Sequence, residues 1–571
     1  MLENLAIGFQ TSLTADNLLW CFVGVLLGTV IGMLPGLGAT TGVAIMIPLT
    51  LTMEPVTALI MLAGIYYGCQ YGGTIAAVLI ATPGDASAVA TTLDGYALAR
   101  KGKAGKALAI AAIGSFIAAI VSLLILCLVA TPIAALTVTF GPTEMLAIMI
   151  MGLLTIVSFS GENLARGLIM AGLGIILSTV GMSAGFAGSR FTFGSVDLLA
   201  GIDFVVVMIG VFAIGEVVSQ VGKGNVKPIR VRIRDTIIRK RDIKESMPAI
   251  GRGTIIGFLL GSLPGAGSTL GSLVAYSAES QISKNRKNFG KGAIEGVAAA
   301  ESANNAAANA NFIPTLTLGV PGGATTAVLL GAFVMYGIQP GPLLFDKQPE
   351  LVWGLLTSFF LGNVILLCLN LPLAPVFAQV LRLNYSYLYP IILFFSLIGA
   401  YAVANSIFAL TIVFVAGIAG YFIKKFDYPT APLILGLVLG PMFERYLVQT
   451  SEFALGDMTI IFRSPIAIGI LAVTVLLLIV PPLARRFTSR GVESIEENVD
   501  ATLSELEAED NAQISGQQPL LVGAGTENGA TQTSNGLPDA NGVLPKRTGT
   551  SRNNDRDHER KLSSKSEDGT P

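Results

Sequence analysis

The chain has 571 residues, of which 52% are hydrophobic and only 13% are charged. Soluble domains carry about 25% charged residues, so this composition excludes an ordinary soluble domain. The formal net charge of −1 says little, because in a membrane protein the placement of charge matters more than its sum.

The histidine, the cysteines and the absence of certain motifs exclude several classes of mechanism. The single histidine, His558, lies in a polar segment near the C-terminus, which excludes any mechanism that needs a histidine inside the membrane. The cysteines occur singly in or beside apolar runs, which is neither a disulfide framework nor a metal-ligand pattern. The chain also lacks the phosphate-binding motif of a primary pump and a paired-aspartate motif. We therefore expect neither an enzyme nor a cofactor other than a coupling ion.

The first unusual element is the segment from Gly24 to Gly42, GVLLGTVIGMLPGLGATTG. Pro35 removes a backbone donor and clashes with the preceding turn, and the flanking glycines tolerate unusual backbone angles. Irregular backbone persists in lipid only when it is buried in protein or lines a wet cavity. The segment therefore predicts a re-entrant hairpin with its tip at mid-membrane.

A second break follows at residues 81–87, ATPGDAS. Asp85 in this motif is a candidate ligand for a coupling cation or a proton, because ionisable groups inside a membrane tend to mark ion pathways. The alternative is a carboxylate at the membrane edge that faces the basic residues at 100–106. The sequence leaves both interpretations open.

Apolar runs long enough to cross a hydrocarbon core of about 30 Å recur along the chain, for example at residues 107–130 and 466–483. They predict an all-α polytopic membrane protein with about ten to twelve transmembrane segments. Lysine and arginine mark cytoplasmic loops, and their strongest cluster lies at residues 223–244. The N-terminus has neither lysine nor arginine before the first span, so we expect it on the outer side of the membrane. It also lacks the basic region of a cleavable signal peptide, so we expect none.

The second half repeats both breaks. Residues 253–271, GTIIGFLLGSLPGAGSTLG, match residues 24–42 at an offset of 253 − 24 = 229, and residues 319–325, GVPGGAT, echo residues 81–87. The first copy leads to LTMEPV, without a basic residue, and the second leads to SKNRKNFGKG. Opposite charge on equivalent loops is typical of inverted-topology repeats. The predicted organisation is membrane repeat 1 (1–222, breaks at 33–41 and 82–85), a cytoplasmic basic linker (223–249), membrane repeat 2 (250–487, breaks at 262–270 and 320–323) and a disordered cytoplasmic tail (488–571).

Residues 301–312, ESANNAAANANF, precede the last break. Asparagines in membrane helices often bond neighbouring helices, which is one interpretation of this run. Polar groups inside the bilayer also mark transport pathways, and the run leads directly into the GVPGG break. The sequence does not decide the depth of Glu301, and we expect Glu279 and Glu295 to flank the cytoplasmic basic loop.

The breaks define candidate binding residues. Half-helices that end at such tips direct backbone amides and a positive dipole end into the membrane centre, which suits an anion, whereas exposed carbonyls suit a cation such as Na⁺. The candidate substrate-binding residues are Gly36, Gly38, Thr40, Thr41, Gly265, Gly267, Ser268, Thr269, Asn304, Asn305, Gly322, Gly323 and Thr325. The candidate coupling-ion residues are Thr82, Gly84, Asp85, Ser87, Ser302 and Asn304, with Na⁺ at the hairpin tips.

Basic residues outside the loop clusters are few, namely Arg166, Arg190 and Arg252. None of them is placed clearly inside the membrane by its sequence context. We therefore expect an anionic substrate to be held by amides, hydroxyls and the Asn304–Asn305 pair rather than by arginine.

At these residues the chain resembles the large membrane subunit of the tripartite tricarboxylate transporters (TctA-type). The blocks that carry the resemblance cover residues 32–50, 66–108, 190–217, 261–279 and 289–333. The resemblance extends from about Asn17 to Pro482, and the tail from about Gly491 lies outside it.

The resemblance implies a secondary transporter of the bacterial inner membrane that takes up citrate-like or other carboxylates, driven by Na⁺ or H⁺. It implies two partners, a periplasmic substrate-binding protein and a small membrane subunit, and no nucleic acid. Analogy to other binding-protein-dependent carboxylate carriers extends this to an elevator-like movement of the domain that bears the two hairpins. The residues themselves leave open a cation antiporter or channel-like protein without an organic substrate. A scaffold without transport is a third class, which would not need intramembrane Asp, Asn and hydroxyl clusters.

Overall fold

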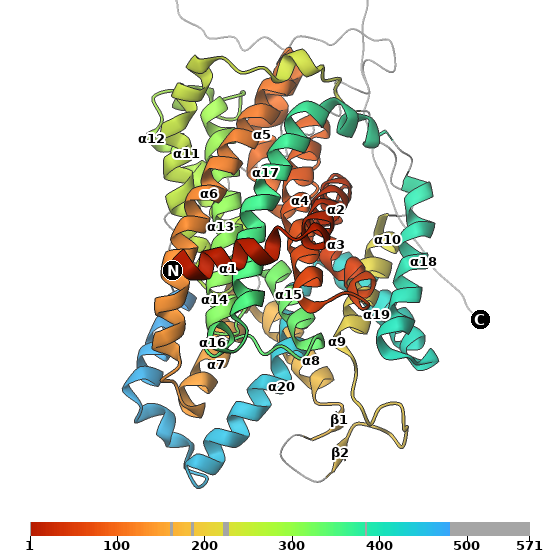
Figure 1. Cartoon of the computed structure of the whole chain (residues 1–571). Helices are drawn as coiled ribbons and strands as arrows, with labels where there is room; N and C mark the ends of the chain where they lie inside the picture. Colours follow the sequence, from red (N-terminus) through yellow and green to blue (C-terminus); the bar gives the residue numbers. More distant parts are fainter. Residues whose placement is uncertain (1, 160–163, 184–187, 221–227, 383–384, 480–571) are drawn as a thin grey trace, which may run out of the picture. The chain divides into compact units, whose positions relative to one another are not determined.

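The computed structural model describes residues 2–159, 164–183, 188–220, 228–382 and 385–479 (Figure 1). The chain divides into two compact units, Met1–Ala508 and Glu509–Pro571, and all described residues belong to the first. The predicted tail and the start of the predicted linker, residues 223–227, lie outside the described residues.

The first half consists of helices, short 3-10 and π turns, and one pair of two-residue strands. In order they are α1 (Leu2–Ser12), α2 (Ala15–Gly32), α3 (Gly38–Met46), η1 (Ile47–Thr50), α4 (Pro55–Ile80), η2 (Ala86–Ala88), α5 (Val89–Leu98), η3 (Ala99–Lys103), α6 (Ala104–Thr137), α7 (Pro142–Phe159), α8 (Leu164–Ser178), β1 (Gly181–Met182), β2 (Ser189–Arg190), α9 (Phe204–Met208), η4 (Ile209–Ile214) and α10 (Gly215–Gln220). The two strands pair antiparallel, with Gly181 opposite Arg190.

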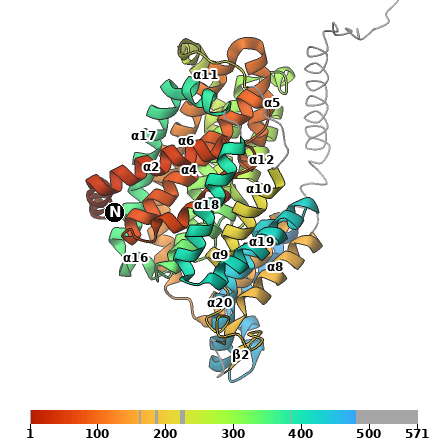
Figure 2. The same ribbon diagram turned by 90° about the vertical axis from the view of Figure 1, so that its right-hand side faces the viewer.

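In the second half, the regular elements of the described residues are all helices or 3-10 turns. In order its elements are η5 (Ile233–Thr236), α11 (Lys240–Gly261), α12 (Gly267–Ile282), η6 (Arg286–Asn288), α13 (Ile294–Ala310), α14 (Phe312–Thr317), α15 (Ala324–Met335), α16 (Leu344–Lys347), α17 (Pro349–Val380), α18 (Tyr385–Ala404), α19 (Ile407–Lys425), α20 (Thr430–Phe453), η7 (Met458–Phe462) and a last apolar helix at Pro465–Ile479. Figure 2 shows α10, α18 and α19 side by side on one face of this unit.

The described residues contain five helices long and apolar enough to cross a membrane, and seven shorter apolar helices of 10–17 residues. The chain is therefore an all-α, multi-pass membrane protein. Two central helices, α4 and α13, belong to neither group. Every residue of α13 and nearly every residue of α4 is buried. Because these helices contact protein rather than lipid, they can carry glycine, tyrosine, threonine and asparagine in place of lipophilic side chains.

Both Pro-Gly segments interrupt a helix with the same backbone geometry. Gly36 and Gly38 have φ of +82° and +58°, and Gly265 and Gly267 have φ of +81° and +65°. Such left-handed angles favour glycine, because a Cβ atom is disfavoured there. The turn hydrogen bonds also match, since Leu37 N donates to the Leu34 carbonyl and the equivalent residue of the second copy donates in the same way. In each case the next helix then folds back onto the one before it.

Glycines hold each hairpin against a central helix. Cβ atoms built on Gly24, Gly28 and Gly32 of α2 would overlap the carbonyl groups of α4, and those on Gly253 and Gly257 of α11 would overlap the carbonyl groups of α13. Glycine is therefore required for the backbones to approach this closely. The contacted residues of the two central helices also correspond at one constant offset: Met61 with Ala299, Ile65 with Ala303, and Cys69 with Ala307.

Candidate functional site

In the first half, the two breaks lie against each other. The amide of Ala39, at the start of α3, donates to Asp85 Oδ2 at 2.8 Å. Asp85 Oδ1 accepts from the amide and the hydroxyl of Ser87, at 3.0 and 2.6 Å. A Cβ atom on Gly84 would overlap the carbonyl oxygen of Gly32, so the chain segments touch through their backbones. The half-buried Asp85 carboxylate is thus fixed at the tip of the first hairpin. Its three donors, the Ala39 amide and the amide and hydroxyl of Ser87, all belong to the two breaks.

In the second half, the equivalent breaks also touch. The amide of Gly267, at the start of α12, donates to the carbonyl oxygen of Gly322 at 3.1 Å. A Cβ atom on Gly323 would lie 3.2 Å from Gly267 Cα. Gly323 is the counterpart of Asp85, because the two positions are separated by the same offset that relates the central helices α4 and α13. The two halves therefore share a backbone arrangement, but only the first carries a carboxylate at this position.

The breaks of one half also contact those of the other. The hydroxyls of Thr40 on α3 and Thr325 on α15 are 2.9 Å apart and form a hydrogen bond. Gln70 Nε2 on α4 donates to Ser268 Oγ on α12 at 3.5 Å. In addition, α12 packs against η2, and α3 and α4 pack against α15 near the centre of Figure 1. All four breaks therefore converge in one region, and we take this convergence as the candidate site.

Most of the predicted residues lie at this convergence or on the first turns of the helices that begin there. They are Gly38, Thr40, Thr41, Gly84, Asp85, Ser87, Gly265, Gly267, Ser268, Thr269, Gly322, Gly323 and Thr325. Thr82 is part of the second break, but its hydroxyl donates to the Ile80 carbonyl. Gly36 lies on the other side of the first tip, where a Cβ atom would meet Gln220 and Glu216 of α10.

The asparagines of the 301–312 run have different roles. Asn309 Nδ2 donates to Ser122 Oγ at 2.8 Å, and Asn311 Nδ2 donates to Tyr66 Oη at 3.1 Å, so these two bond neighbouring helices. Asn305 Nδ2 donates to the carbonyl of Glu301 within its own helix, as the hydroxyl of Ser302 does to Ala298.

Asn304 differs from its neighbours. It is fully buried on α13, and neither its Oδ1 nor its Nδ2 has a hydrogen-bond partner among the described residues. A buried amide without a partner costs about 1–3 kcal/mol, so a native protein retains one only for a reason. Asn304 thus has both side-chain polar atoms unbonded, whereas Asn311 of the same run lacks a partner only for its Oδ1.

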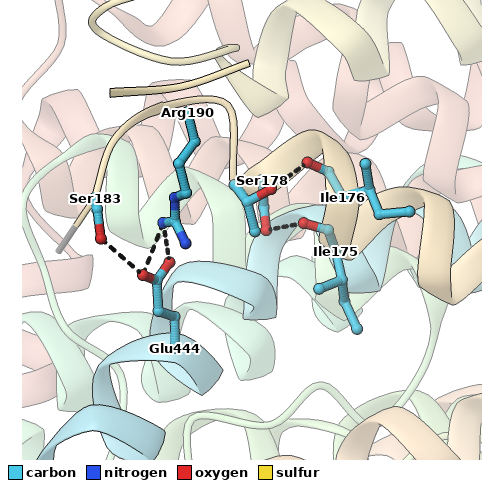
Figure 3. A network of polar contacts seen from close by, with 7 residues as sticks. Ile175, Ile176, Ser178, Ser183, Arg190 and Glu444 are labelled. Atoms are coloured by element: carbon cyan, nitrogen blue, oxygen red, sulfur yellow. Dashed lines mark hydrogen bonds and ion pairs between the residues drawn. The ribbon is translucent and has the colours of Figure 1, made fainter. Parts of the chain in front are cut away.

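The isolated arginines are engaged away from the convergence. Arg190, on β2, donates to both carboxylate oxygens of Glu444 on α20, at 2.7 and 2.8 Å, and Figure 3 shows Ser183 bonded to the same carboxylate. Arg252 binds Glu279 through two hydrogen bonds of 2.7 and 2.6 Å. Arg166 stacks on the Tyr428 ring, with 5.2 Å between its guanidinium carbon and the ring centroid. None of these side chains supplies a free positive charge to the site.

Two features of the site were missed at the level of the sequence. Glu301 is fully buried and accepts hydrogen bonds from two threonines of other helices. Glu216 on α10 is buried and forms an ion pair with Lys424 of α19. Glu216 also accepts from Gln220 Nε2, which in turn bonds the Pro35 carbonyl of the first break. The sequence did contain a sign that Glu301 is buried. It lies three and four residues before Asn304 and Asn305, and residues at that spacing share a helix face.

A family model described as the tripartite tricarboxylate transporter TctA family matches residues 18–435. The chain belongs to the TctA family. It is therefore a transporter component and not an enzyme, and the matched region includes all four breaks of the candidate site.

Two relatives of this TctA-family chain come from Agrobacterium vitis. One, described as an uncharacterised 52.8 kDa protein in the TAR-I ttuC' 3' region, is 43% identical over 499 residues, which are 87% of this chain and 99% of the relative. The other, described as an uncharacterised protein in the TAR-II ttuC' 3' region, is 44% identical over 230 residues, which are 40% of this chain and 95% of the relative. No solved structure matches the chain.

Proposed function

We propose that this protein carries a tricarboxylate or related carboxylate inward across the bacterial inner membrane, coupled to Na⁺ or H⁺. In this proposal it is the large membrane subunit, which works with a periplasmic substrate-binding protein and a small membrane subunit, and its C-terminal tail is cytoplasmic. The family supports a transport role in a tripartite system. The observation that carries the proposal is the convergence of the four breaks.

The chemistry of the convergence favours an anion with oxygen atoms. Three helices, α3, α12 and α15, begin there, so their N-terminal amides and positive dipole ends share one region. The hydroxyls of Thr40, Ser268, Thr269 and Thr325 lie on the first turns of these helices. Because the isolated arginines are engaged elsewhere, amides and hydroxyls are the donors left to bind carboxylate groups. Asp85 is the candidate ligand for the coupling cation at the same place.

The proposed mechanism moves the convergence as part of a domain formed by the two hairpins. The equal φ angles of the two tips, their matching turn hydrogen bonds and the constant offset between the central helices support a pair of structural repeats. Loop charge supports their opposite orientation in the membrane. With the site between the repeats, an elevator-like displacement would expose the same residues first outside and then inside.

Uptake of labelled carboxylates into proteoliposomes tests this function directly. The purified chain, with its binding protein and small subunit, is expected to accumulate at least one tricarboxylate when a Na⁺ or H⁺ gradient is imposed. Thr269→Ala and Asn304→Ala are each expected to reduce this uptake, because they remove a tip hydroxyl and the unpartnered amide. If no carboxylate is taken up under either gradient, but the protein dissipates the gradient itself, the protein is a cation carrier without an organic substrate. Normal binding and uptake by both variants would place the site elsewhere.

The Thr40–Thr325 hydrogen bond predicts that the two halves are energetically coupled at the site. Thr40→Val and Thr325→Val are each expected to destabilise the folded protein by about 1 kcal/mol, as the loss of one buried hydrogen bond does. The double variant should be little worse than either single variant, because one bond is lost in all three. A double-mutant cycle of thermal unfolding in detergent measures this coupling. Strict additivity of the two changes would show that the hydroxyls do not interact.

A further inference from the structure

The carboxyl group of Glu301 lies in a closed polar cage beside the candidate site. Glu301 is in the middle of α13 and has 0% of its surface exposed. Its Oε1 accepts from Thr91 Oγ1 of α5 at 2.5 Å, and its Oε2 accepts from Thr74 Oγ1 of α4 at 2.8 Å. Asn304 and Asn305 follow one turn later on the same helix. The cage thus joins three helices that lead to the breaks.

No positive side chain balances this carboxyl group among the described residues. The nearest helices carry basic residues that are already paired: Arg252 of α11 binds Glu279 of α12, and Lys106 of α6 binds Asp242 of α11. A buried and unpaired carboxylate is strongly disfavoured, and such a group usually becomes neutral by binding a proton.

The other titratable groups that face this region from the surrounding elements are acidic or phenolic and have partners of their own. Asp85, just before η2, bonds Ser87, and Tyr71 of α4 bonds the Leu108 carbonyl. Asp94 of α5 bonds Tyr276 of α12 and the amides of Gly292 and Ala293, and Glu295 of α13 bonds Asn285. None of them can neutralise Glu301.

The hydrogen bonds of Thr74 leave a place for a proton on Glu301. A threonine hydroxyl has one hydrogen to donate. Thr74 Oγ1 has two acceptors within reach, Glu301 Oε2 at 2.8 Å and the Gln70 carbonyl at 3.2 Å. With an ionised carboxylate, the Thr74 hydroxyl donates to only one of these two acceptors. With a proton on Oε2, Glu301 donates to Thr74, Thr74 donates to Gln70, and Thr91 still donates to Oε1.

We infer that Glu301 is a proton-binding residue that couples proton movement to transport, an inference that rests on the proposed function. Water on the outer side supplies the proton to Oε2, where an O–H bond forms and neutralises the buried charge. The proton returns to water on the inner side when the cage opens, so no other reactant is needed. Gln70 connects the two events, because its carbonyl faces Thr74 and its side chain bonds Ser268 at the second tip.

Infrared difference spectroscopy of the full chain in lipid nanodiscs tests proton occupancy without transport. The C=O stretch of a protonated carboxyl group is expected in the parent at neutral pH and in the control Glu295→Gln, and it should be lost in Glu301→Gln. Gln has nearly the shape of the protonated acid, so we expect Glu301→Gln to fold. Should it not, Thr91→Val provides the second test, because loss of one donor to Oε1 should shift the band to higher frequency. A band unaffected by both variants would overturn the inference.

Transport by proteoliposomes separates coupling from substrate binding. With labelled citrate as the probe and the binding protein present, Glu301→Gln is expected to lose accumulation driven by a proton gradient but to keep citrate exchange across the membrane. Accumulation by Glu301→Gln equal to that of the parent, or parent accumulation that follows only a Na⁺ gradient, would overturn the inference. If citrate does not move in the parent, the infrared result still decides whether Glu301 binds a proton, so failure of the proposed function is recognised separately.

Discussion

Replacing Gly84 by alanine is expected to abolish uptake and to lower the thermal stability of the protein markedly. The added methyl group would overlap the backbone carbonyl oxygen of Gly32, and because a Cβ atom and a carbonyl group are both fixed by the backbone, no side-chain rotation relieves the overlap. Overpacking of this kind commonly costs about 1–3 kcal/mol, and more when backbone segments must separate. The separation would also move Asp85 away from the amide of Ala39 that it binds.

Thermal unfolding in detergent and carboxylate uptake in proteoliposomes measure the effect of Gly84→Ala. The matched control is Gly172→Ala on α8, where a Cβ atom would have no neighbour within 4 Å. The control should unfold and transport like the parent. Parent-like behaviour of both variants would show that the two breaks do not need their close backbone contact.

Replacing Lys424 by methionine is expected to destabilise the protein by up to about 3 kcal/mol, which is below the usual cost of breaking a fully buried ion pair because the Lys424 side chain is 28% exposed. The variant leaves the buried carboxylate of Glu216 without its counter-charge. The double variant Glu216→Gln with Lys424→Met removes both charges and should recover most of this loss. Thermal unfolding of both single variants and the double variant provides the comparison.

The same pair predicts an effect on the site. Glu216 orients Gln220, whose Nε2 donates to the Pro35 carbonyl at 3.2 Å. A disturbed Glu216 therefore leaves a carbonyl of the first break without this donor, and uptake should fall together with stability. If the two single changes add in the double variant, the charges act independently and the pair does not support the break.

Local chemistry made the breaks predictable from the sequence. A proline among glycines in an apolar run has few structural solutions in a membrane, and the structure interrupts the helices between Gly32 and Gly38 and between Gly261 and Gly267. The repeated motif also indicated which segments are equivalent. The membrane class could be predicted from the composition together with the length of the apolar runs, because runs long enough to span a bilayer are not found in soluble domains.

Long-range pairing was not predictable in the same way. Lys424 lies in a basic pair, Lys424–Lys425, which loop-charge reasoning assigns to the cytoplasm, and nothing near it in sequence indicates a bond with Glu216. The depth of Glu301 was undecided for the same reason, since its partners Thr74 and Thr91 come from the other half of the chain. Asn304 and Asn309 have similar sequence surroundings, and the hydrogen bonds of Asn309 with Tyr67 of α4 and with α6 distinguish them.

The polar character of α13 has a consequence for how the protein is assembled. A helix with two glutamates and three asparagines is poorly suited to partition into lipid alone, because charged residues at a helix centre cost about 2.5–3.5 kcal/mol on insertion scales. By contrast, α6 and α17 lie in segments that are long and apolar enough to cross a membrane. We therefore expect α13 to enter the membrane packed against α4, α6, α11 and α12, which precede it in the chain and surround it. The two halves of the chain would then become a stable membrane protein together, and a fragment that lacks the first half, with α4 and α6, would be a substrate for membrane proteases.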